Sequence, residues 1–191
     1  MEPAPVAVPR GAHRLSLLGR VAGLLRERRI PFAVIGAAAM AVRGVSRSTR
    51  DVDLLVVDPE CLSPATWESL RLEGIAVSIR RGDADDPLAG AVRLTGPGHA
   101  MLDIIVGRAA WQARVLERAS PGKIEEVSVP VATAADLVLL KLYAGGPHDA
   151  WDVEQLLAGP GRAALVAEVD AALGSLPEDS HRLWARIVGS R

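Results

Sequence analysis

Two aspartates stand directly before an apolar run in the segment Thr49-Arg50-Asp51-Val52-Asp53-Leu54-Leu55-Val56-Val57. The apolar residues that follow Asp53 predict a buried strand over residues 52–57. Side chains at positions i and i+2 of a strand share a face, so Asp51 and Asp53 are expected side by side at the start of this strand. Two carboxylates this close repel each other unless a cation lies between them. The pair therefore requires a fold in which the first residues of a buried strand are exposed to solvent or lie beside a bound cation.

The cation that suits such a pair best is Mg²⁺, which prefers oxygen ligands and commonly binds together with phosphate. Asp51 and Asp53 are accordingly candidate metal ligands. The alternative interpretation is a solvated strand entrance, in which Arg47 or Arg50 neutralises the two acids.

Composition limits the class of protein. The chain has 191 residues, 49% of them hydrophobic, enough for one well-packed domain or for a core domain with a small appended one. A net charge of −1 excludes a uniformly basic nucleic-acid coat but not a local cationic patch. The single cysteine, Cys61, excludes an internal disulfide framework and a cysteine-based zinc cluster. Residues 1–10 lack the apolar segment of a secretory signal, and the longest apolar run, 32–42, is about half of a membrane span. We expect a cytoplasmic protein with no membrane partner.

The periodicity predicts a mixed α/β half followed by an all-helical half. We assign residues 1–131 to an α/β core that begins with a flexible lead-in over 1–10, and residues 132–191 to a C-terminal helical subdomain. The expected core elements are a helix over 15–25, strands over 32–35, 52–57, 75–80, 91–95, 100–106 and 127–131, and helices over 37–42, 63–73 and 109–118. Helices over 133–143 and 148–157 and two further helical segments complete the chain. The tryptophans fall on predicted helices as core anchors: Trp67, Trp111, Trp151 and Trp184.

Gly36 and Asp103 extend the candidate site. Gly36 separates a predicted strand from a helix, whose first N–H groups can hold a phosphate, although such a turn also favours glycine for backbone reasons. Asp103 interrupts the apolar strand 101–106, where a lone buried carboxylate is costly. Its partner is expected to be either an arginine or a metal shared with Asp51 and Asp53. If the two strands are neighbours, three carboxylates converge, which suits two-metal phosphoryl or nucleotidyl transfer.

These residues resemble a known superfamily. The order strand–Gly36–helix–Arg47-x-Thr49-x-Asp51-x-Asp53–strand, with Asp103 on a later strand, resembles the nucleotidyltransferase superfamily of the DNA polymerase beta fold. The segment Asp136-Leu137-x-x-x-Lys141-Leu142-x-Ala144-Gly145-x-x-x-Asp149-x-x-Asp152 is similar to small bacterial abortive-infection-type toxin nucleotidyltransferases of type IV toxin–antitoxin systems. The similarity spans residues 32–157. It implies a mixed sheet flanked by helices, with a C-terminal helical subdomain.

The resemblance also implies roles for individual residues. It implies Mg²⁺ ligands at Asp51, Asp53 and Asp103, with Asp103 also a candidate to accept the proton of the incoming hydroxyl. It implies phosphate contacts from Gly36, Ala37 and Lys141, and a nucleotide pocket lined by Arg47 and Thr49. For Asp149 and Asp152, one helical turn apart, the simpler interpretation is that an acid in the first turn complements the helix dipole.

The activity that follows is transfer of a nucleoside monophosphate from an NTP to an acceptor hydroxyl, with Mg²⁺. The expected acceptor is an RNA end (tRNA-like) or a protein, and a toxin-type member would have a cognate antitoxin. Two alternatives remain. One is a nucleotidyltransferase that modifies a small molecule such as an aminoglycoside, and the Asp83-Asp85-Asp86 cluster is the feature that favours it. A cationic surface around Arg43, Arg47, Arg50 and Arg80 would instead favour RNA as the acceptor. The other is a catalytically weak domain that binds a nucleotide or a partner.

Two departures from the superfamily pattern bear on activity. Ala37-Ala38 replace the usual second glycine and the Ser or Thr that often follows it. Pro147 and His148 stand where toxin-like members often carry a basic residue.

Overall fold

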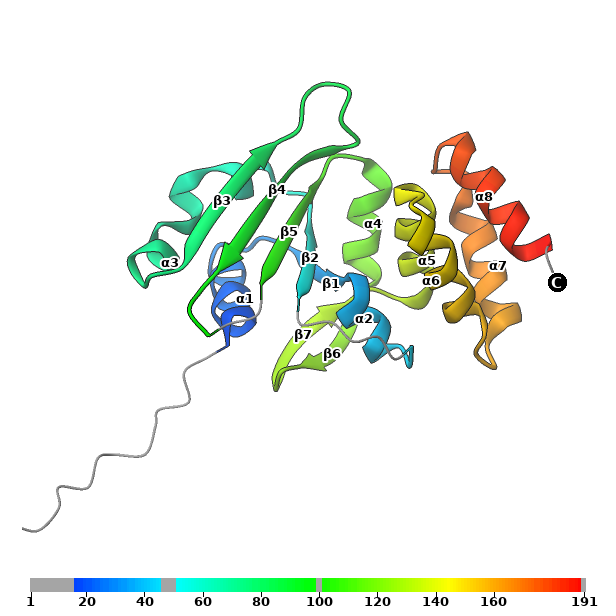
Figure 1. Ribbon diagram of the computed structural model, residues 1–191, viewed down its shortest axis with the longest axis horizontal. Helices are drawn as coiled ribbons and strands as arrows, with labels where there is room; N and C mark the ends of the chain where they lie inside the picture. Colours follow the sequence, from blue (N-terminus) through cyan, green and yellow to red (C-terminus); the bar gives the residue numbers. More distant parts are fainter. Residues whose placement is uncertain (1–15, 46–50, 99–100, 190–191) are drawn as a thin grey trace, which may run out of the picture.

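The computed structural model describes residues 16–45, 51–98 and 101–189 of the chain. Its centre is one seven-stranded sheet with the order β3-β4-β5-β2-β1-β7-β6 (Figure 1). The strands are β1 Phe32–Ile35, β2 Val52–Val56, β3 Ala76–Arg81, β4 Leu88–Thr95, β5 Leu102–Gly107, β6 Ser120–Ile124 and β7 Val127–Val131. The pairs β2–β5 and β1–β7 are parallel and the other neighbours are antiparallel. The predicted α/β class with a mixed sheet is confirmed.

The helices divide into those that pack around the sheet and those that follow it. The first group is α1 Leu17–Glu27, α2 Gly36–Val42, α3 Glu68–Leu72 and α4 Ala110–Arg118, with the 3₁₀ turns η1 Pro59–Leu62 and η2 Pro64–Trp67. The second is α5 Ala134–Ala144, α6 Pro147–Leu157, α7 Arg162–Leu173 and α8 Glu178–Gly189. Figure 1 shows this second group stacked on one side of the molecule, beside α4 and far from β3. None of the helices in the described ranges is long and apolar enough to cross a membrane.

The central strands are apolar on one face and carry the acids on the other. The buried face of β2 and β5 consists of Val52, Leu54, Val56, Leu102, Ile104 and Val106. Because side chains alternate along a strand, Asp53 and Asp103 point to the opposite face. The sheet therefore positions both acids while it builds the core.

Two sequence predictions about individual elements were wrong, and one strand was not predicted. The helix expected over 63–73 is observed as the 3₁₀ turn η2 followed directly by the short helix α3, and a separate 3₁₀ turn, η1, precedes it with Pro59 at its start. The edge strand β6 was not predicted, because Pro121 and Gly122 are weak strand formers. Its backbone pairing with β7 stabilises the strand despite these residues. Trp151 is 50% exposed on α6 and is not a core anchor, unlike the other three tryptophans.

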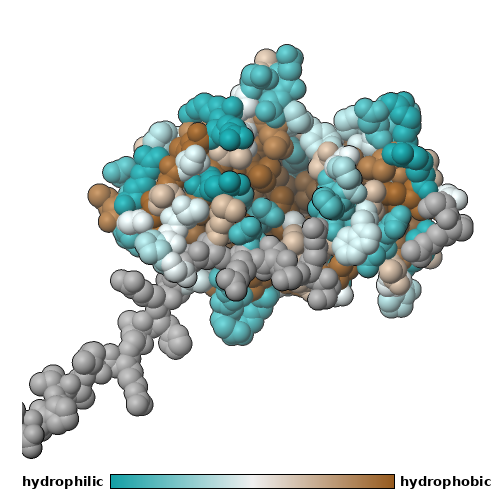
Figure 2. Space-filling model, viewed as in Figure 1, coloured by the Kyte–Doolittle hydropathy of each residue, from teal (hydrophilic) through white to brown (hydrophobic). Residues whose placement is uncertain are grey.

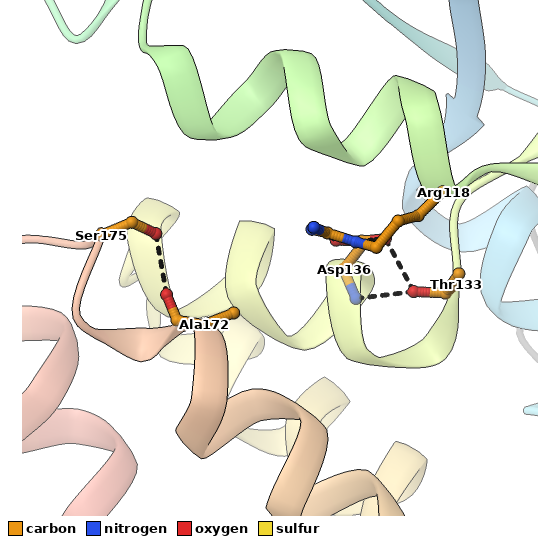
Figure 3. Close-up of polar contacts among 5 residues, drawn as sticks. All are labelled: Arg118, Thr133, Asp136, Ala172 and Ser175. Atoms are coloured by element: carbon orange, nitrogen blue, oxygen red, sulfur yellow. Dashed lines mark hydrogen bonds and ion pairs between the residues drawn. The ribbon is translucent and has the colours of Figure 1, made fainter.

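An ion pair between the exposed Arg118 and the buried Asp136 joins α5 to α4 (Figure 3). The carboxylate of Asp136 is completely buried, and it accepts hydrogen bonds from the Arg118 guanidinium and from Thr133 Oγ1, the latter at 2.7 Å. Thr133 also caps α5 by accepting from the Asp136 N–H at 3.1 Å. In the same view, Ser175 Oγ donates to the Ala172 carbonyl at 2.8 Å and closes the end of α7.

The ion pair makes a prediction about stability. Replacing Arg118→Met leaves the buried Asp136 carboxylate without its cation, and we expect the free energy of unfolding to fall by about 2 kcal/mol. Arg114→Met removes an exposed arginine from the same helix and is expected to change it by no more than about 0.5 kcal/mol. Denaturant unfolding of both variants measures the difference, and equal losses would contradict the role given to Arg118.

Candidate active site

The parallel pairing of β2 with β5 brings two of the predicted acids together. Asp53 and Asp103 are direct partners across the two strands, and both are half-buried. Asp51 is exposed, directly precedes β2, and stands two residues before Asp53. The condition set for convergence of the acids, that the strands bearing Asp53 and Asp103 are neighbours, is therefore met.

Electrostatics at Asp53 reflect this proximity. Burial raises the pKa of the Asp53 carboxyl above its ordinary value, and the negative charges of Asp103 and Asp51 raise it further. The positive charges of Lys141 and Arg93 lower this pKa but do not cancel the rise. The carboxylates of Asp51, Asp53 and Asp103 thus repel one another, and additional positive charge beside them would stabilise the folded protein.

Asp103 has an arginine partner in this structure. Arg93 stands opposite Asp103 on β4, and its Nε and Nη2 donate to Asp103 Oδ1 and Oδ2, each at 2.8 Å. An arginine, one of the two kinds of partner expected for Asp103, is therefore present. Within the described residues, no three Asp, Glu, His or Cys side chains are drawn together closely enough to form a ready metal cluster.

Gly36 presses directly against Asp53. Its φ is +66°, a left-handed conformation that glycine adopts at little cost, and a Cβ built there would lie 2.1 Å from Asp53 Oδ2. The antiparallel pairing of β1 with β2, which sets Ile35 opposite Asp53, produces this contact. Ala37 follows as the second residue of α2 and is half-buried. Gly36 is needed here for both its backbone conformation and its lack of a side chain.

Lys141 is held by two acids of the following helix. Its Nζ lies 2.7 Å from Asp149 Oδ1 and 2.6 Å from Asp152 Oδ2, and Asp152 is completely buried. Burial alone would lower the pKa of Lys141, but the hydrogen bonds to Asp149 and Asp152 outweigh it and raise the pKa. Asp149 also accepts from the Gly146 N–H at 2.8 Å. The two acids therefore do more than complement the helix dipole: they fix a charged lysine in place.

An apolar pocket of about 330 Å³ lies between the sheet and α5. Leu55 and Ile105, two residues beyond Asp53 and Asp103 on the same sheet face, form part of its lining. The other lining residues are Ile35, Gly36, Pro87, Leu88, Gln112, Leu140, Lys141, Tyr143, Ala144 and Asp149. Figure 2 shows an apolar hollow between the sheet half and the helical half of the molecule. Gly36 and Lys141 thus face one pocket adjacent to the carboxylates.

Several residues considered from the sequence lie elsewhere or outside the described ranges. Arg47, Thr49 and Arg50 fall outside the described residues. Arg43 does not line the pocket; its guanidinium donates to the carbonyls of Ala132 and Val131, at 2.9 and 2.8 Å, and anchors α2 to β7. The expected cationic surface therefore does not include a free Arg43.

Two residues near the site were not predicted. One is Arg93, which occupies an alternating strand and gives no signal until its pairing with Asp103 is known. The other is Gln112, buried on α4, whose Oε1 accepts from the N–H groups of Arg108 and Ala109, each at 2.9 Å. A glutamine in an amphipathic helix has no sequence pattern that marks it as part of a pocket lining.

We compared the chain with known proteins by sequence and by structure. No protein-family model and no curated protein sequence matches the chain. Among solved structures, ANT(2″)-Ia in complex with adenylyl-2″-tobramycin aligns with a TM-score of 0.55 and 16% identity over 83% of this chain and 95% of that one. A solution structure of the antibiotic-resistance factor ANT(2″)-Ia aligns with 18% identity over 91% and 90% of the two chains, at a TM-score of 0.47. The lincomycin-bound lincosamide adenylyltransferase LnuA aligns with 15% identity over 73% and 93%, at 0.46.

The chain therefore has a nucleotidyltransferase fold, as the resemblance in its sequence implies. More particularly, the fold is similar to that of ANT(2″)-Ia, with which it aligns at a TM-score of 0.55 over most of both chains.

The contact between Gly36 and Asp53 can be tested by one methyl group. Gly36→Ala adds both a strained positive φ and a clash with a carboxylate, so we expect at least about 2 kcal/mol of lost stability. Gly74→Ala is the matched control: Gly74 also has a positive φ, +84°, but a Cβ there meets open space, and the strain alone costs about 1 kcal/mol. Denaturant unfolding compares the two, and a loss at Gly36 no greater than that at Gly74 contradicts the contact.

The raised pKa of Asp53 predicts how stability depends on pH without metal. At acid pH this carboxyl is protonated in both folded and unfolded chains; as pH rises, the unfolded chain ionises first and the folded state loses stability. Asp53→Asn does not ionise and escapes this loss. We expect the unfolding free energy of Asp53→Asn to exceed that of the unaltered protein by a margin that grows from acid to neutral pH, measured in EDTA. The exposed Glu27→Gln at the end of α1 is the control, and no growing margin is expected for it.

Proposed function

We propose that this protein is a Mg²⁺-dependent nucleotidyltransferase that moves a nucleoside monophosphate from an NTP to an acceptor hydroxyl. The observation that supports it most is the alignment of Asp53 with Asp103 on parallel strands, with Asp51 two residues before Asp53. The fold shared with ANT(2″)-Ia is consistent with this chemistry.

The chemistry of the donor set fits Mg²⁺. Carboxylate oxygens are its preferred ligands, and the mutual repulsion that raises the Asp53 pKa is what a divalent cation would relieve. We propose Asp51, Asp53 and Asp103 as its ligands, the last after exchange of Arg93. When bound, Mg²⁺ supplies activation of the attacking oxygen and neutralisation of the departing pyrophosphate.

The remaining residues are proposed to bind and orient the nucleotide. The apolar pocket beside the carboxylates suits a nucleoside, and Lys141, kept protonated by Asp149 and Asp152, suits its phosphates. Gly36 and Ala37, at the start of α2, are proposed to approach the triphosphate by their backbone. Arg47 and Thr49 keep their proposed place in the nucleotide pocket.

Asp103 is proposed as the group that accepts the proton of the incoming hydroxyl. It is half-buried, and a carboxylate at this position can orient a hydroxyl before transfer. Proton acceptance requires one of its oxygens to face the acceptor.

For the acceptor we favour a macromolecule, an RNA end or a protein hydroxyl, in a toxin-type protein with a cognate antitoxin. The second candidate is a small cationic acceptor. Its support is the acidic loop between β3 and β4, which carries Asp83, Asp85 and Asp86 directly before the pocket residue Pro87. Asp83 Oδ1 accepts from the backbone N–H groups of Asp85 and Asp86, each at 3.0 Å, and so shapes this loop. A nucleotide- or partner-binding domain is the third, supported by Ala37-Ala38.

Transfer can be measured directly. The protein is incubated with each α-labelled NTP, Mg²⁺, and in turn an RNA extract, a protein extract and an aminoglycoside. We expect label in RNA or protein, and a loss of at least about a hundredfold in Asp53→Asn, which removes a proposed metal ligand while keeping the side-chain shape. Glu27→Gln retains full activity.

Each outcome decides between the candidates. Label in the aminoglycoside alone supports the small-molecule acceptor. NTP binding without transfer to any acceptor supports the binding domain. Equal labelling by the unaltered protein and Asp53→Asn shows that the catalytic assignment is wrong.

A further inference from the structure

Arg93 binds the carboxylate of Asp103 with both of its donor groups. The guanidinium Nε and Nη2 lie 2.8 Å from the two oxygens, the bidentate geometry in which arginine and carboxylate interact most strongly. The Arg93 side chain is 57% exposed, whereas that of Asp103 is 20% exposed. The pair therefore consists of an anchored acid and an accessible cation.

The surroundings leave Arg93 room to move. On the same sheet face, Ala91 lies two residues before it on β4, and Ser78 is its partner on β3, so these two adjacent side chains are small. Figure 1 shows no helix in front of β3 and β4. Rotation of the Arg93 side chain away from Asp103 requires no rearrangement of the core.

The guanidinium and a divalent cation compete for the same acid. A carboxylate has about four lone-pair sites, so Arg93 does not block Asp103 sterically on every side. Its fixed positive charge nevertheless repels a divalent ion brought to the same two oxygens, and an arginine cannot lose that charge in a protein. Without Arg93, by contrast, Asp103 would stand beside Asp53 with no neutralising partner on its own side.

We propose that Arg93 is a positioning residue that holds Asp103 in the cation-free site and yields it when a divalent cation enters. This inference rests on the metal site of the proposed function. In the absence of a cation, Arg93 neutralises Asp103 and fixes the orientation of its carboxylate. It also lowers the affinity of the site for a divalent cation that binds without substrate. Full occupation of the carboxylates then requires that Arg93 leave, for solvent or for an anionic group of the bound substrate.

Direct metal binding tests this without any measurement of activity. Binding of Mn²⁺, used as the probe in place of Mg²⁺, is followed by the loss of the free-ion electron paramagnetic resonance signal. We expect Arg93→Met to bind Mn²⁺ more tightly than the unaltered protein, on the order of tenfold, because one positive charge beside the site is lost. Arg80→Met is the matched control: Arg80 pairs with Ala91, lies on the same face one strand further away, and its loss is expected to change the affinity by less than about twofold.

A double-mutant cycle shows whether Arg93 acts through Asp103. In the Asp103→Asn background, Arg93→Met is expected to give a clearly smaller gain in Mn²⁺ affinity, because only the longer-range effect of its charge on Asp53 remains. Thermal unfolding in EDTA verifies that each variant is folded before its affinity is compared.

The outcomes separate this inference from the proposed function. If the unaltered protein binds Mn²⁺ and Asp53→Asn does not, but Arg93→Met binds no more tightly, Arg93 is not a competitor and the metal site stands. A gain of undiminished size in Asp103→Asn also overturns the inference. If neither the unaltered protein nor any folded variant binds Mn²⁺, the metal site itself is wrong, and the inference falls with it.

Discussion

Asp53 and Asp103 lie level with each other on two parallel strands, so their negative charges face one another at the margin of an apolar sheet. Most features of the site are responses to this repulsion. Gly36 gives Asp53 space that any other residue would fill, Arg93 neutralises Asp103 from the other side, and Lys141 contributes a positive charge from the helical half. Stability alone would favour apolar residues at these strand positions, which is why the acids point to function.

The helical half contributes through one apolar helix, α5, that carries two well-partnered charges. Asp136 in its first turn is bound by Arg118 of α4, and Lys141 in its last turn is bound by Asp149 and Asp152 of α6. Each pair joins α5 to a different neighbour, so the helix is fixed at both ends. The position of the lysine beside the pocket therefore depends on contacts made more than a turn away from it.

Much of this architecture could be predicted from the sequence because it depends on local patterns. The strand after Asp53, the turn at Gly36 and the helix capped by Thr133 all follow from periodicity and capping residues. What could not be predicted depends on pairing across the sheet. Neither Arg93 opposite Asp103 nor the strand β6, stabilised by β7 rather than by its own residues, can be inferred without knowing which strands are neighbours. The 3₁₀ turn over 59–62 could have been anticipated from Pro59 at its start.

The side-by-side alignment of β2 and β5 has a consequence for how the protein can fail. A slip of β5 by one residue would turn Asp103 into the core and expose Leu102 and Ile104, each of which contributes about 2 kcal/mol by burial. Hydrophobic packing thus fixes the relative positions of Asp53 and Asp103, because a chain with a misaligned β5 loses this packing and is less stable. Conversely, substitutions that loosen the core beneath β5 can disable the acids without altering any of them. Damage of that kind would appear as a loss of function that deepens with temperature.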